Sequence, residues 1–332
     1  MMPGENAAFV TAEECDQEMN TSETVRDARI TALLANVEKV IIGKPEITKL
    51  AVTALIAGGH ILIEDVPGVG KTQLAAALAR SCGGVFGRIQ MTPDIMPSDV
   101  TGFSLLKPGT GELEFRKGAV FCNFLLADEI NRSSPKSQSA LLEAMEEMRV
   151  TMDGETYELP APFMVLATQN PVETYGTYSL PEAQMDRFMM KLHIGYPNAS
   201  DELSIIRKGR EEDARNLESV ITPGDIVDMQ KKAERINCSE ACEKYILSIV
   251  FATRSNDGIK LGISPRGSIA LTRAAKAYAY IEGRDYVIPD DIKFLAPHCL
   301  GHRLMLSPQG KSKWGEGSEA IKSITSSLEV PV

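Results

Sequence analysis

The sequence of 332 residues has no long apolar run, no closely paired cysteines and no excess of basic residues. No apolar stretch approaches the ~20 residues that a membrane-spanning helix needs. The N-terminus lacks the basic-then-apolar pattern of a signal peptide. These absences predict a cytoplasmic protein without a membrane span.

Neither the cysteines nor the net charge points to a metal, redox or nucleic-acid function. The six cysteines are scattered and never spaced as C-x-x-C, which favours reduced thiols. The net charge of −10 argues against a general nucleic-acid binder.

The length suits roughly two domains, with a hydrophobic fraction of 43% that is ordinary for a globular chain.

A glycine loop between an expected strand and an expected helix predicts a phosphate site. The run 60–64 is apolar, the loop follows, and 73–80 favours a helix. Gly68 and Gly70 allow positive φ, so that backbone N–H groups converge on phosphate oxygens. Lys71 supplies a charge for the β- and γ-phosphates and the Thr72 hydroxyl suits Mg²⁺. The plain alternative is a glycine-rich turn before an ordinary helix.

The loop departs from the pattern G-x-x-x-x-G-K-[ST] at its first position, where Asp65 stands in place of glycine. The backbone of the loop depends more on Gly68 and Gly70, so we expect the departure to be tolerated.

Further apolar runs indicate a parallel sheet with polar residues at the strand ends. Residues 123–127 precede Asp128 and Glu129, and 163–168 precede Asn170. Ligands bind at the carboxyl ends of strands in open α/β sheets. We expect Asp128 to hold the Mg²⁺ shell, Glu129 to activate water and Asn170 to orient the water or the γ-phosphate. The alternatives are helix caps and an Asn-Pro turn.

The order of elements predicts an α/β nucleotide-binding domain over 23–197, with a central parallel sheet flanked by helices. Inserts are expected at 92–120, as a helix and hairpin, and at 149–162, as a hairpin around Asp153-Gly154. Helix start signals after Ser200 predict a small all-α domain over 198–310. Residues 1–22 read as a disordered acidic tail and 311–332 as a C-terminal tail with one short helix.

Six ordered blocks of sequence give the chain a resemblance to the MoxR group of AAA+ ATPases over nearly all of 30–310. The blocks are Glu-Asp-Val-Pro-Gly-Val-Gly-Lys-Thr (64–72), Leu-Leu-Ala-Asp-Glu-Ile-Asn-Arg (125–132), Gln-Ser-Ala-Leu-Leu-Glu-Ala-Met (138–145), Ala-Thr-Gln-Asn-Pro (167–171), Leu-Pro-Glu-Ala-Gln-Met-Asp-Arg-Phe (180–188) and Ser-Pro-Arg-Gly (264–267).

The resemblance implies a role for each matching residue. Lys71 and Thr72 match Walker A, Asp128 and Glu129 match Walker B, and Asn170 matches sensor 1. Arg187 matches the arginine finger that is given to a neighbouring subunit, with Arg132 as a rival, and Arg266 matches sensor 2 on the lid. By spacing alone, each arginine would more often be an ordinary surface residue. The nucleotide-binding residues implied are Ile41, Ile42, Gly43, Pro67, Gly68, Val69, Gly70, Lys71, Thr72, Gln73 and Arg266.

The resemblance further implies Mg²⁺-dependent ATP hydrolysis by a ring, expected to be hexameric. It implies a chaperone-like role in the maturation of other protein complexes or in cofactor or metal insertion into them, and a partner with a von Willebrand factor A domain. In such a ring the two inserts would line the central face. Two other functions stay open: a DNA-directed AAA+ motor or loader, and a nucleotide-gated subunit like the motor subunit of magnesium chelatase.

Overall fold

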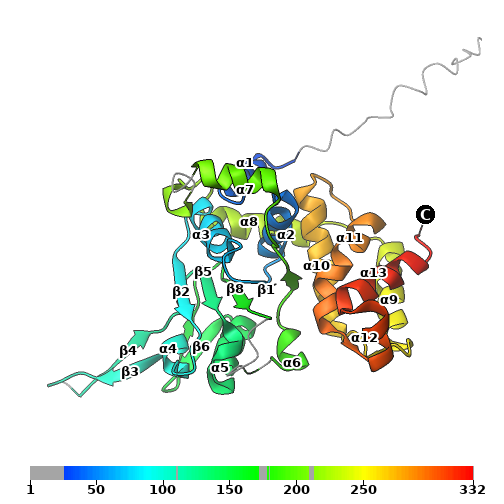
Figure 1. Cartoon of the computed structure of the whole chain (residues 1–332). Coiled ribbons are helices and arrows are strands. Elements are labelled where there is room, and N and C mark those ends of the chain that lie inside the picture. Colours follow the sequence, from blue (N-terminus) through cyan, green and yellow to red (C-terminus); the bar gives the residue numbers. More distant parts are fainter. Residues whose placement is uncertain (1–25, 110, 172–177, 179, 209–212, 332) are drawn as a thin grey trace, which may run out of the picture.

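The computed structural model describes residues 26–109, 111–171, 178, 180–208 and 213–331. The tail predicted over 1–22 lies outside these residues. Figure 1 shows two parts: an α/β unit and a helical lid that contains the C-terminus. None of the helices in the described ranges is long and apolar enough to cross a membrane.

The α/β unit is built on a five-stranded parallel sheet with the order β2-β5-β8-β1-β9. Each neighbouring pair of strands is parallel. The strands are β1 (Ile61–Glu64), β2 (Phe86–Gln90), β5 (Phe124–Asp128), β8 (Met164–Gln169) and β9 (Met190–Leu192). This arrangement confirms the predicted α/β class with a central parallel sheet.

The central strands are apolar up to their carboxyl ends because both faces of the sheet are covered. Successive side chains of a strand point to opposite faces. Phe124 and Leu126 of β5 therefore pack with helices on one face, while Leu125 and Ala127 pack with α5 on the other. The helices of this unit are α1 (Ala28–Glu38), α2 (Pro45–Ile56), α3 (Lys71–Ser81), α4 (Pro97–Thr101), α5 (Pro135–Glu147) and α6 (Glu182–Met185).

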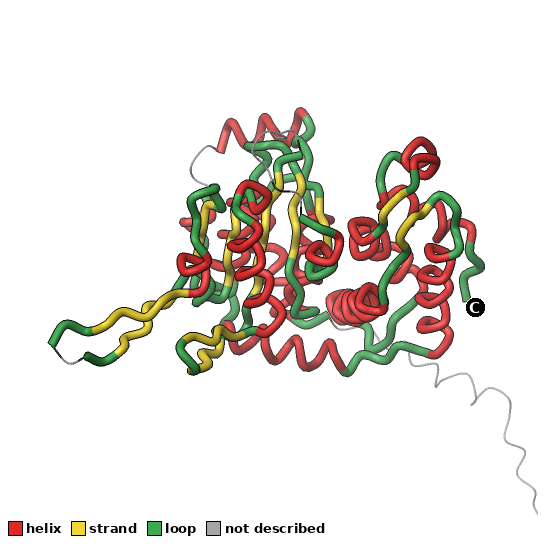
Figure 2. Tube along the Cα trace, turned by 90° about the horizontal axis from the view of Figure 1, so that it is seen from below, coloured by secondary structure: helices red, strands yellow, loops and turns green. Residues whose placement is uncertain are grey.

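The two inserts form hairpins that touch each other. The first contains α4, β3 (Gly102–Leu106) and β4 (Leu113–Lys117), and the second contains β6 (Arg149–Met152) and β7 (Glu155–Glu158). The rings of Phe115 and Tyr157 stack with centroids 4.2 Å apart. Figures 1 and 2 show the β3–β4 hairpin projecting at the end of the molecule opposite the lid.

The turn of the second hairpin follows from its sequence. Asp153 and Gly154 both have positive φ, of 53° and 82°. Two-residue hairpin turns with positive φ at both central positions favour the pair Asp-Gly.

The lid is mainly helical, and its core continues into that of the α/β unit. It also contains a short antiparallel pair, β10 with β11, so the expectation of a purely helical domain was incomplete. The elements that follow β9 are α7 (Ala199–Lys208), η3 (Ala214–Asn216), α8 (Pro223–Glu234), α9 (Glu240–Arg254), β10 (Ile259–Leu261), α10 (Pro265–Ile281), α11 (Pro289–Leu300), η4 (Gly301–Arg303), β11 (Met305–Leu306), α12 (Pro308–Trp314) and α13 (Gly317–Ser327).

The segment after residue 310 contains the predicted short helix, but it is not a tail. It holds most of α12 and all of α13, and Ala320, Ile321 and Ile324 are buried. These positions lie on one side of a helix, which explains why α13 packs against α9 and α11. The segment is therefore part of the lid core.

The α7 helix, which was predicted to belong with the lid, contacts the α/β unit. A Cβ placed on Gly43, in the loop after α1, would collide with the Asp201 side chain of α7. After α7, the backbone N–H of Ala214 donates to Gln73 Oε1 at 3.0 Å. The predicted boundary at 197 thus separates α7 from elements that it touches.

His60, which is buried, and His302, which is half-buried, are expected to make the stability of this fold depend on pH. The backbone N–H of Val165 donates to His60 Nδ1 at 3.0 Å, so Nε2 carries the proton and donates to the Met145 carbonyl. Burial lowers the pKa of His60 to about 4 and that of His302 to about 3. The unfolded chain therefore binds more protons than the folded chain below pH 6.5, the pKa of an exposed histidine.

Acidification from pH 7 to pH 5 should lower the free energy of unfolding by about 2 kcal/mol for each of these two histidines. Chemical denaturation at the two pH values measures the change. His193, which is exposed, provides the control: His193→Gln should leave the pH dependence intact. Equal free energies of unfolding at pH 7 and pH 5 would contradict the inference that His60 and His302 are neutral in the folded chain.

Candidate functional site

The loop between β1 and α3 has the conformation of an anion-binding turn. Gly68 and Gly70 have φ of 89° and 97°, which glycine adopts without strain. Gly70 is also the N-cap of α3 and offers no capping side chain. The first N–H groups of α3 are therefore left to bind an anion, and the helix dipole favours negative charge there.

Lys71 lies at the start of α3 among acidic groups. Its Nζ donates to the carbonyl oxygen of Asp65 at 2.7 Å. Partial burial lowers the pKa of Lys71, and nearby carboxylates, first that of Asp128, act in the opposite direction. The ammonium thus lies between the loop and the end of β5.

Asp65 fastens the phosphate loop at the position where glycine was expected. Its carboxylate accepts hydrogen bonds from the N–H of Val66 at 2.9 Å and from the N–H of Gly195 at 2.7 Å. Gly195 belongs to the connection between β9 and α7. The aspartate therefore ties the start of the loop to the connection that leads to α7.

The loop of Ile41, Ile42 and Gly43 lies beside the same connection. Lys44 Nζ donates to the carbonyl of Tyr196 at 2.9 Å, and Gly43, at φ of 71°, faces Asp201. The loop of Ile41, Ile42 and Gly43, the start of α7 and the phosphate loop are thus joined by a chain of contacts.

Asp128 and Glu129 end β5 as predicted, and the neighbouring strand holds both. Thr168 Oγ1 of β8 donates to Asp128 Oδ1 at 2.7 Å and accepts from the N–H of Glu129 at 2.8 Å. Glu129 has a φ of 56°, uncommon for a residue other than glycine. Because of this turn, the carboxylates of Asp128 and Glu129 point in different directions although the two residues are adjacent in the sequence.

Asn170 is buried directly after β8, the strand between β5 and β1. Gln169 pairs with Glu64 in the register of β8 and β1, so Asn170 is level with Asp65. It therefore lies at the sheet edge where the phosphate loop and the two acids meet.

Two polar residues of β2 that the sequence motifs do not single out also contact the acids. Arg88 Nη2 donates to Asp128 Oδ2 at 2.7 Å, and Gln90 Nε2 donates to Glu129 Oε2 at 2.8 Å. Gln90 pairs with Asp128 in the parallel register. Arg88 and Gln90 are two residues apart in the sequence, which places both side chains on one face of the strand. This spacing is the sequence signal that points to them.

Arg132 lies in the site of its own chain. Its Nη1 is 3.0 Å from Glu129 Oε2, so it contacts the acid expected to activate water.

Arg187 and Arg266 lie together at the opposite edge of the sheet. Arg187 Nε donates to Glu146 Oε2 at 2.9 Å, and Arg266 Nη2 contacts Oε1 of the same carboxylate. Met189, just after Arg187, donates its N–H to the carbonyl of His60, immediately before β1. The phosphate loop begins after the other end of β1, about 16 Å along an extended chain. The structure does not bring Arg266 to the phosphate loop of its own chain.

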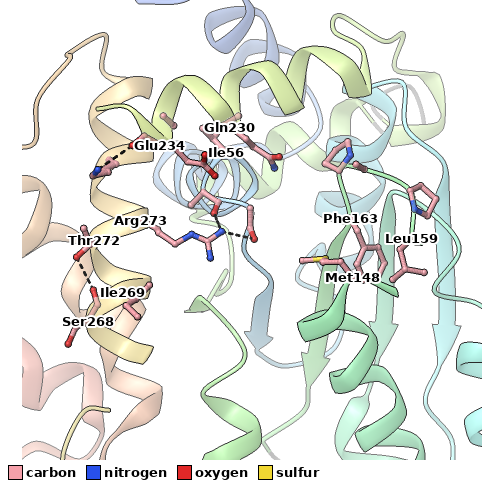
Figure 3. Close-up of a pocket in the computed structure, with 17 residues that line it drawn as sticks. Ile56, Met148, Leu159, Phe163, Gln230, Glu234, Ser268, Ile269, Thr272 and Arg273 are labelled. Carbon is pink, nitrogen blue, oxygen red and sulfur yellow. Dashed lines mark hydrogen bonds between the residues drawn. The ribbon is translucent and has the colours of Figure 1, made fainter. Parts of the chain in front are cut away.

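A large cavity also lies at this second edge (Figure 3). It measures about 550 Å³ and is lined by the end of α2, the loop 159–163, α8 and the side of α10 that carries Ile269 and Arg273. The Arg273 guanidinium donates to the carbonyls of Ala57 and Gly58. Because the lining includes no residue of the phosphate loop, this cavity is not the predicted nucleotide site.

Comparisons with known proteins agree with this geometry. A family model described as "ATPase family associated with various cellular activities (AAA)" matches residues 60–190, and one described as "AAA lid domain" matches 251–324. The YeaC protein of Bacillus subtilis is 50% identical over 298 residues, which cover 90% of this chain and 93% of that protein.

Two other relatives are similar over most of their length. Chaperone MoxR1 of Mycobacterium tuberculosis is 41% identical over 280 residues, covering 82% of this chain and 74% of that protein. A crystal structure from Cytophaga hutchinsonii, assigned as an ATPase, superposes with a TM-score of 0.84 at 40% identity, covering 92% of this chain and 95% of that one.

The role of Asp65 can be tested by restoring the glycine of the usual pattern. Asp65→Gly removes the carboxylate that accepts from Val66 and Gly195 and loosens the backbone, so we expect ATP affinity to fall about tenfold. Calorimetric titration with ATP measures the change. Asp65→Asn retains one side-chain oxygen as acceptor and should lose less. Tighter binding by Asp65→Gly would show that Asp65 is a defect in the loop.

Proposed function

Because the chain belongs to the MoxR family of AAA+ ATPases, we propose that it binds and hydrolyses ATP with Mg²⁺ in a ring of identical subunits. The observation that carries this proposal is the separation of the two groups of site residues. Lys71, Asp128 and Glu129 gather at the carboxyl edge of the sheet, and Arg187 and Arg266 gather at the amino edge. A complete site then needs two copies of the chain.

Each residue at the carboxyl edge has a task that its position supports. The α3 N–H groups and Lys71 bind the β- and γ-phosphates. Glu129 accepts a proton from the attacking water, which the Asn170 amide orients. In the present arrangement Glu129 is engaged by Gln90 and Arg132, so it must exchange these contacts for the water.

The donors near the phosphate loop suit Mg²⁺. The ion prefers oxygen ligands and keeps several waters, so it needs few protein groups. The Thr72 hydroxyl in the first turn of α3 and the Asp128 carboxylate, which lies close to Lys71, would hold it. When bound, Mg²⁺ would neutralise charge on the phosphate oxygens.

We assign the arginine given to the neighbouring subunit to Arg187, accompanied by Arg266. Arg132 is the weaker candidate because it pairs with Glu129 of its own chain. A head-to-tail contact, in which the amino edge of one subunit meets the carboxyl edge of the next, generates a ring when the rotation closes. We propose a hexamer on the grounds of the family resemblance.

The name of the relative MoxR1 supports a chaperone-like role. We propose that ATP turnover drives maturation of a client protein complex, or cofactor or metal insertion into it. We also propose a protein with a von Willebrand factor A domain as a partner. The inserts with β3–β4 and β6–β7 are the proposed client-contacting elements.

The nucleotide site can be tested by separating binding from hydrolysis. Lys71→Ala should abolish ATP binding, because the loop loses its cation. Glu129→Gln should bind ATP with near-normal affinity and hydrolyse it at least about 100-fold more slowly, because the amide cannot take the proton. Titration with ATP and a phosphate-release assay measure the two steps, with Glu147→Gln as a surface control. Normal turnover by Glu129→Gln would refute the assignment of Glu129.

A further inference from the structure

Glu146, at the end of α5, joins two arginines that come from different parts of the fold. Its Oε2 accepts from Arg187 Nε at 2.9 Å, while its Oε1 contacts Arg266 Nη2. Arg187 follows α6, and Arg266 is the second residue of α10. One carboxylate therefore links α5, the segment before β9 and the lid.

The three side chains share one cavity. Glu146, Arg187 and Arg266 line a hollow of about 220 Å³ at the amino edge of the sheet. Their side chains are 36%, 29% and 46% exposed, so the cluster is open to an approaching surface. An arginine has five N–H donors, and a contact to one carboxylate oxygen uses only part of them.

A second ion pair fixes the backbone segments that carry the two arginines. Arg303 of η4 pairs with Asp186, and Arg303 is 3% exposed. Ser264, two residues before Arg266, donates to Asp186 Oδ2 at 3.1 Å. The backbone positions of Arg187 and Arg266 are thus fixed independently of Glu146. The Arg187 side chain also donates from Nη1 to the carbonyl of Ala183 at 2.9 Å, so Glu146 is needed mainly to align Arg266 with it.

Two guanidinium groups that approach each other repel. Each of them contacts the same carboxylate, so they lie within a few ångströms of each other, and the negative charge between them offsets the repulsion. Without Glu146 the Arg266 side chain would move away from Arg187 into solvent, because long exposed side chains gain rotational freedom there.

We propose that Glu146 is a positioning residue that holds Arg187 and Arg266 as a pair for the nucleotide bound on the neighbouring subunit. This inference rests on the proposed function. The pair presents two cations to one γ-phosphate, where charge spreads over the oxygens in the transition state. Glu146 acts through the arginines and does not itself touch the nucleotide.

The test compares Glu146→Ala and Glu146→Gln with Glu147→Gln in the full-length protein. Glu147 is the matched control, because it neighbours Glu146 on α5 and pairs with Arg149 at 3.0 Å, outside the cluster. We expect Glu146→Ala to lower kcat about tenfold or more, with KM for ATP and the denaturation midpoint unchanged. Glu146→Gln, which keeps the shape but not the charge, should fall between Glu146→Ala and the parent.

A mixing experiment distinguishes positioning in the neighbour from a structural effect. Glu146→Ala subunits have an intact carboxyl edge, and Glu129→Gln subunits have an intact arginine pair. Mixing the two should recover activity above the sum of the separate preparations. A defect of folding, or one confined to the subunit's own nucleotide site, would not be recovered in this way.

Measuring Arg187→Ala in parallel distinguishes a failure of the inference about Glu146 from a failure of the arginine assignment in the proposed function. If Arg187→Ala is inactive while both Glu146 variants keep the parent kcat, Glu146 is an ordinary surface ion pair and the inference is overturned. If Arg187→Ala is fully active, the arginine assignment in the proposed function fails as well. If Glu146→Ala unfolds, the Glu146→Gln variant decides by the same kcat criterion.

Discussion

The parallel alignment of the five strands is the constraint on which the rest of the structure depends. In such a sheet the carboxyl ends of all strands meet at one edge and the amino ends at the other. β1, β5 and β8 deliver the phosphate loop, the two acids and Asn170 to the first edge. The segment before β9 and the start of α10 deliver Arg187 and Arg266 to the second edge, beside Glu146. A single chain cannot fold these edges together without breaking the sheet, so the geometry favours a site that is shared between copies.

Contacts away from the strands set the shape of each edge. At the carboxyl edge, Asp65 fastens the loop to Gly195, and the connection through Tyr196 reaches the loop before α2. These hydrogen bonds would therefore transmit a movement of α7 to the phosphate loop. At the amino edge, the pair of buried Arg303 and half-buried Asp186 fixes the lid to the segment before β9. Each edge is therefore stabilised by a carboxylate, Asp65 at one and Asp186 at the other, to which the family resemblance gives no role.

The sequence was sufficient to predict the sheet and the residues at its carboxyl edge, because strand ends place them there. Lys71, Asp128 and Asn170 each follow a recognisable apolar run. The contacts of Arg88 and Gln90 with the acids depend on the register of β2 against β5, which a single sequence does not specify. The position of Arg266 beside Arg187 and Glu146 depends on how the lid packs, so the motif alone does not specify it. The sequence predicts a short helix where α13 lies, but not that it belongs to the lid core, because its few apolar residues become informative only against α9 and α11.

The central claim is that one nucleotide site is built from two copies of the chain. It is tested most directly by the ATPase rate per subunit, measured against protein concentration together with the molar mass in solution. If the site is shared between copies, the rate per subunit rises steeply as the mass changes from monomer to ring and then becomes constant. A rate per subunit that stays constant down to concentrations at which the protein is monomeric would contradict it.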